Sequence, residues 1–222
     1  MREKLLSRIE DELLRLRHDV GRSARDRSGP VGFGIDGALV SGLTDGTLTP
    51  QQERELAGQV ARLLPYHWAQ SNSSAEAMSQ VTDFLGGQRE LAVWLDRFPG
   101  FPRLAARLYV FMGLLDRLSE TSAVVTALRE DRERTPYPPG LRGYLVPETD
   151  DETVAGISFR IEEHLSDGET DKAVDLALAM ADWLRRAAPR AQEIDPGLHD
   201  LGELMDHSHQ DLQDAAAELH PA

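Results

Sequence analysis

Apolar residues recur every three or four positions at the start of the chain, which predicts an amphipathic helix over residues 1–20. Charged residues fill most of the positions between them, so the apolar stripe is narrow. The stripe covers too few heptads for a coiled coil, but it could pack on the same chain or pair with a second copy. We treat it as a candidate interaction seam, which contains Leu6, Ile9, Leu13 and Leu16.

Residues 21–48 lack a helical period and are rich in glycine, serine and proline, so we expect a mostly irregular connector. Within it, GFGIDG at 32–37 has the glycine spacing of a dinucleotide-binding turn. That turn requires a buried strand before it, and the preceding RSARDRSGPV is too polar for one. The spacing alone therefore gives no support for a nucleotide site.

Residues 49–133 carry repeated helical periods and are expected to form a helical core body. The run TPQQ at 49–52 has the residue types of an N-terminal capping box, and Pro65 is placed to end that helix. The most apolar face belongs to a helix that begins near Arg103 and is expected to continue to about Glu133. Two further helices are expected between these, over residues 74–85 and 88–98.

A proline-rich linker is expected over residues 134–150, which contain four prolines and no helical period. The charge of the chain changes at the same place. The net charge is −14, and the residues from Glu148 to the end hold 19 acidic and 5 basic side chains. Three helical periods follow, so residues 151–222 are expected to form an acidic helical subdomain. Thr170 and Asp195 are the expected N-caps of the second and third helices.

These patterns together predict an all-α fold, in which a multi-helix, bundle-like body is followed by an acidic three-helix C-terminal subdomain. The chain has no cysteine, which excludes thiol nucleophiles and thiolate metal sites. The N-terminus lacks the apolar stretch of a signal peptide, and no apolar run is long enough to cross a membrane, so we expect a cytoplasmic protein. An acidic surface favours a basic protein partner and disfavours nucleic acid.

The strongest candidate for metal chemistry lies on the last predicted helix. Glu203, His207 and Asp211 are spaced by four residues and therefore share one helix face, which makes a partial site for a divalent metal. Three residues of the first acidic helix could complete it: Glu162, Glu163 and His164. A solvent-facing polar helix surface explains the same pattern without a metal, and no cofactor is required by it.

Aromatic residues supply a second candidate site. Eight of the thirteen aromatic residues fall between positions 66 and 111, where they either build the core or line an apolar ligand pocket. The residues expected in such a pocket are Tyr66, Trp68, Trp94 and Phe101.

The sequence contains none of the common nucleophile or phosphate-binding motifs, so it favours a protein without enzymatic activity. We expect an interaction or regulatory protein that uses its acidic helical surface and its N-terminal seam, and a homodimer through the seam is compatible with this. Two alternatives remain open, namely a small-molecule-binding protein with the aromatic pocket and a metal-dependent helical enzyme.

Overall fold

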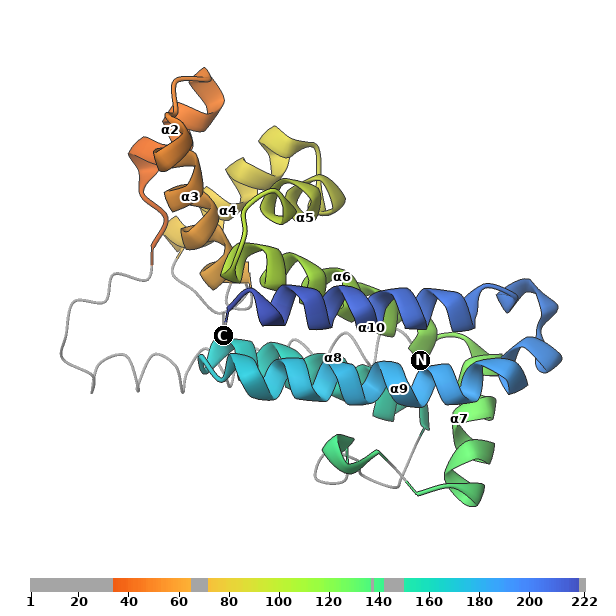
Figure 1. The fold of residues 1–222 in the computed structure, drawn as a ribbon. Coiled ribbons are helices and arrows are strands. Elements are labelled where there is room, and N and C mark those ends of the chain that lie inside the picture. Colours follow the sequence, from red (N-terminus) through yellow and green to blue (C-terminus); the bar gives the residue numbers. More distant parts are fainter. Residues whose placement is uncertain (1–33, 65–71, 137, 142–149, 220–222) are drawn as a thin grey trace. The chain divides into compact units, whose positions relative to one another are not determined.

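The computed structural model describes residues 34–64, 72–136, 138–141 and 150–219, and over these ranges the protein is all-α, without strands (Figure 1). This confirms the predicted fold class. The predicted helix over residues 1–20 lies outside the described residues. The α-helices are α2 (Gly37–Asp45), α3 (Pro50–Leu63), α4 (Asn72–Leu85), α5 (Gln88–Asp96), α6 (Phe101–Ser119), α7 (Ser122–Arg134), α8 (Asp150–Ser166), α9 (Thr170–Ile194) and α10 (Leu201–Ala217).

The chain divides into two compact units, Met1–Leu91 and Ala92–Ala222. The division falls inside α5 and therefore inside the stretch 49–133, which was expected to form one helical body. Among the described helices of the first unit, α2 and α3 pack together and α2 also packs on α4. The second unit contains α6 to α10.

Helix α2 lies within residues 21–48, where the sequence pattern favoured irregular structure. Its first turn is capped by Asp36, whose carboxylate accepts a hydrogen bond from the backbone N–H of Ala38 at 2.8 Å. Leu39 and Val40 are buried, and Gly46 ends the helix with a positive φ of 67°. Two buried apolar residues and good caps are enough for a short helix that has little periodicity to reveal it.

The capping box of α3 is confirmed. Thr49 Oγ1 accepts from the backbone N–H of Gln52 at 3.3 Å, and Gln52 Oε1 accepts from the backbone N–H of Thr49 at 3.0 Å. Two backbone donors that the helix cannot satisfy are paired in this way. Leu56 and Val60, one turn apart, are fully buried on the inner face.

In the second unit, α6, α8, α9 and α10 run side by side, and α7 packs mainly on α9 (Figure 1). The short turn at Asp167–Glu169 makes α8 and α9 antiparallel neighbours. One continuous apolar core joins all five helices. The helices of the acidic stretch 151–222 therefore share their core with α6 and α7, and a separate acidic subdomain is not confirmed. The fully buried residues of this shared core include Leu108, Ile161 and Leu184.

Three helix boundaries differ from the sequence expectation. The helix expected from Arg103 to Glu133 is two helices, because Thr121 Oγ1 bonds the carbonyl of Arg117 at 3.0 Å and the chain turns there. Helix α9 begins after Glu169 and continues through Pro189, whose position on the exposed side lets the helix continue. Asp195 caps a short 3-10 turn by accepting from the backbone N–H of Gly197 at 2.9 Å, and α10 begins only at Leu201.

None of the helices within the described ranges combines the length and the apolar character that a membrane span needs.

Candidate functional site

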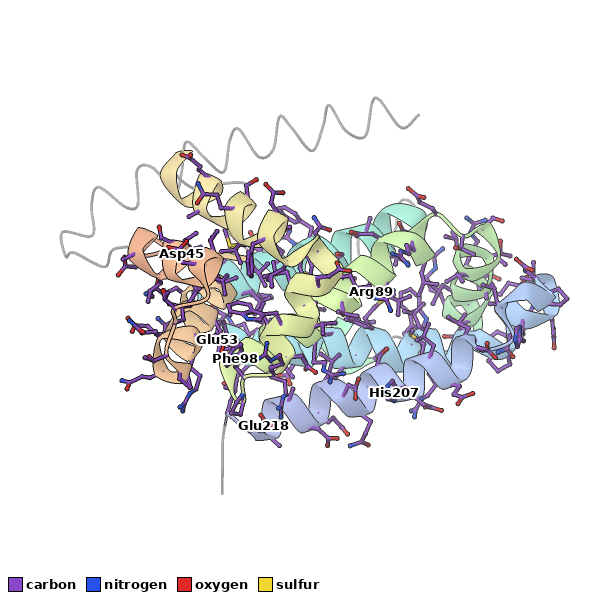
Figure 2. All side chains as sticks on the ribbon, turned by 90° about the horizontal axis from the view of Figure 1, so that it is seen from above. Asp45, Glu53, Arg89, Phe98, His207 and Glu218 are labelled. Atoms are coloured by element: carbon purple, nitrogen blue, oxygen red, sulfur yellow. The ribbon has the colours of Figure 1, made fainter. Side chains whose placement is uncertain are left out.

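The residues predicted to bind a metal lie on α10, but the carboxylate of Asp211 already pairs with an arginine side chain. Arg107 on α6 donates to Asp211 and also makes two hydrogen bonds to Asp96, at 2.8 and 2.9 Å. His207 Nε2 is 3.5 Å from Asp211, and its side chain is 75% exposed on the outer side of α10 (Figure 2). Glu203 is exposed one turn earlier. Arg107 thus links α6 to α10 through Asp211.

The three residues expected to complete that metal site do not converge on it. His164 Nδ1 pairs with Glu169 at 2.8 Å, and Glu163 pairs with Arg160 on its own helix. Glu162 faces α6. Over the described residues, no group of three histidine, aspartate or glutamate side chains is arranged to hold a metal ion.

The predicted aromatic pocket is described only in part, because Tyr66 and Trp68 lie outside the described residues. Trp94 is buried, and its ring packs edge-on against Phe98 with ring centroids 5.3 Å apart. Phe101 is the partly buried first residue of α6. Trp94 is thus a core residue, and the pocket itself stays a prediction. The interaction seam of Leu6, Ile9, Leu13 and Leu16 also lies outside the described residues.

The junction of α5, α6 and α10 is held by a further ion pair. Glu218 accepts a hydrogen bond from the backbone N–H of Gly100 at 3.1 Å and pairs with Arg103. Glu218 and the nearby Phe98 can be followed in Figure 2. Burial of Phe98 and the paired carboxylate of Glu218 both favour a structural role for this junction.

Polar side chains that the sequence did not single out as a group lie between α6 and α8. Tyr109 and Asp116, seven residues apart, share one face of α6, and Ser158 and Glu162, four residues apart, share one face of α8. Ser158 is buried, and its hydroxyl donates a hydrogen bond to the Asp116 carboxylate. This contact joins the two helices at a polar position beside their apolar core.

The environment of these groups disfavours negative charge. Burial raises the pKa of Glu162 to about 7, and the nearby Asp116 adds to the shift. Partial burial also raises the pKa of Asp116, with a contribution from Glu120, while the hydrogen bond from Ser158 opposes the shift. The pKa of Tyr109 is raised by burial and then by Glu162 and Asp116. No arginine or lysine of the described residues pairs with either carboxylate.

Most other interhelical carboxylates of the second unit are paired. Asp131 on α7, for example, accepts from Trp183 Nε1 at 3.1 Å and from Arg186 at 2.8 Å, both on α9. Glu130 pairs with Arg190 at 2.7 Å. The arginines of these helices are therefore committed to structural contacts, whereas Asp116 and Glu162 lack such a partner within the described residues.

Each of these two helices, α6 and α8, also has one large apolar side chain that is exposed. Phe159 on α8 is 39% exposed, and Val110 on α6 is 58% exposed. The helical positions place Phe159 about 60° around α8 from Glu162, on the side away from Ser158. Val110 lies about 120° around α6 from Asp116, on the flank that carries Arg103 and Arg107. Val110 therefore lies apart from the two carboxylates.

Fold and site together define an all-α protein in which two carboxylates on neighbouring helices have no arginine or lysine partner among the described residues. Comparisons with protein-family models, with curated proteins and with solved structures give no match.

Proposed function

We propose that this protein is a non-enzymatic, cytoplasmic interaction or regulatory protein that binds a basic protein partner through an acidic helical surface. One observation supports the proposal most directly. Asp116, an exposed residue of α6, lies near the half-buried Glu162 of α8, and neither carboxylate has a cationic partner among the described residues. A cation from a partner would relieve the repulsion that these two carboxylates impose on each other.

The net charge of the acidic stretch supports the same proposal, because an excess of 14 negative charges after position 147 steers basic partners toward this part of the chain. Ion pairs on an exposed surface are weak individually, so the affinity for a basic partner must also depend on apolar contact.

The proposal is tested by titrating the full-length protein into a fluorescently labelled helical peptide of leucine and arginine and measuring fluorescence anisotropy. A peptide of the same length and pattern with glutamate in place of arginine is the control. We expect binding of the basic peptide only, with an affinity that weakens as the salt concentration rises. Equal binding of both peptides, or no binding of the basic peptide, would show the proposal to be wrong.

The N-terminal seam remains a separate prediction of a homodimer. Light scattering after size-exclusion chromatography should give a dimer mass for the wild type and a monomer mass for Leu13→Asp, because the charge would lie in the centre of the seam. A monomeric wild type would contradict the dimer and leave the proposal for the acidic surface standing.

A further inference from the structure

We draw no further inference here: the strongest candidate, the apolar surface that the exposed side chains of Val110 on α6 and Leu204 on α10 contribute to these two helices, carries none, because nothing in the described part of the chain shows what covers it.

Discussion

Replacing Glu162 by glutamine removes a carboxyl group whose pKa is raised in the folded chain. Burial and the nearby Asp116 raise the pKa of Glu162 from 4.5 to about 7, so the folded chain keeps this proton more tightly than the unfolded chain. A raised pKa of an acid contributes stability that is fully present below the unfolded-state pKa and is lost as the pH rises through the folded-state pKa. The window for Glu162 therefore lies between about pH 4.5 and about pH 7.

The size of the effect follows from the same two values. One pKa unit corresponds to 1.36 kcal/mol, so a shift from 4.5 to about 7 corresponds to about 3 kcal/mol across the whole window. This is an upper figure because part of the Glu162 side chain remains in contact with water. Glu162→Gln carries a neutral amide of nearly the same shape and has no such pH dependence at this position. Relative to the variant, the wild type should lose about 2 to 3 kcal/mol between pH 5 and about pH 8.5.

The groups around Glu162 that carry or can carry charge are Asp116 and Tyr109 on α6. Helices α7 and α9 also pack on α8 and meet its apolar core residues, which include Ile157 and Ile161. Carboxylates whose pKa is lowered by their partners, such as Glu169, lose their contribution only as the pH falls below about 4.5. A range from about pH 5 upward therefore excludes those carboxylates, and the difference between wild type and Glu162→Gln leaves Glu162 and its interaction with Asp116.

The measurement is urea-induced unfolding followed by tryptophan fluorescence at several pH values, because Trp94 and Trp183 are both buried in the second unit. Glu163→Gln serves as the control, since it removes one carboxylate from the same helix at a position paired with Arg160. A constant difference in stability between wild type and Glu162→Gln from about pH 5 to about pH 8.5 would refute the reasoning.

Two further predictions concern packing. Trp183→Phe should lower the free energy of unfolding by about 1 to 3 kcal/mol in the same assay, because it removes the 3.1 Å hydrogen bond to Asp131 and part of a buried ring; an unchanged value would contradict this. Gly140→Ala should destabilise by about 1 kcal/mol, because its Cβ would lie 2.9 Å from the Cβ of Ala179. A Cβ atom at Gly156 would meet no atom within 4 Å, so Gly156→Ala should instead stabilise helix α8 by about 0.5 to 1 kcal/mol. A change of the same sign for both glycine substitutions would contradict these two predictions.

Local signals explain which parts of the fold the sequence could predict. The capping box at Thr49 and Gln52 involves residues three positions apart, and it forms as expected. The passage of α9 through Pro189 was not predictable from local rules, because the cost of one missing backbone hydrogen bond is offset by burial of Ala187, Ala188 and Ala191 around it.

The division between α6 and α7 also depends on more than periodicity. Apolar residues continue at helical spacing on both sides of the break, and the only local sign is a run of hydroxyl and acidic residues from Ser119 to Ser122. Hydroxyl side chains that bond the carbonyls of the last turn compete with the continuing helix, as Thr121 does.

The candidate sites show more clearly that spacing within one helix does not predict contacts between helices. Glu203, His207 and Asp211 share a helix face as predicted, but the spacing of residues on one helix says nothing about Arg107, which comes from α6 and binds Asp211. Conversely, Asp116 and Glu162 are 46 positions apart and carry no shared motif. Their only local sign is a polar residue beside each apolar stripe.

The proximity of Asp116 and Glu162 follows from the antiparallel packing of α6 on α8, which the hydrogen bond between Ser158 and Asp116 fixes at one point. Seen along α8, Ser158 and Glu162 lie one turn apart, so the same packing that buries Ser158 brings Glu162 toward Asp116. Replacing Asp116 with a neutral residue should therefore bring the pKa of Glu162 closer to its ordinary value, because the Asp116 charge adds to the effect of burial there.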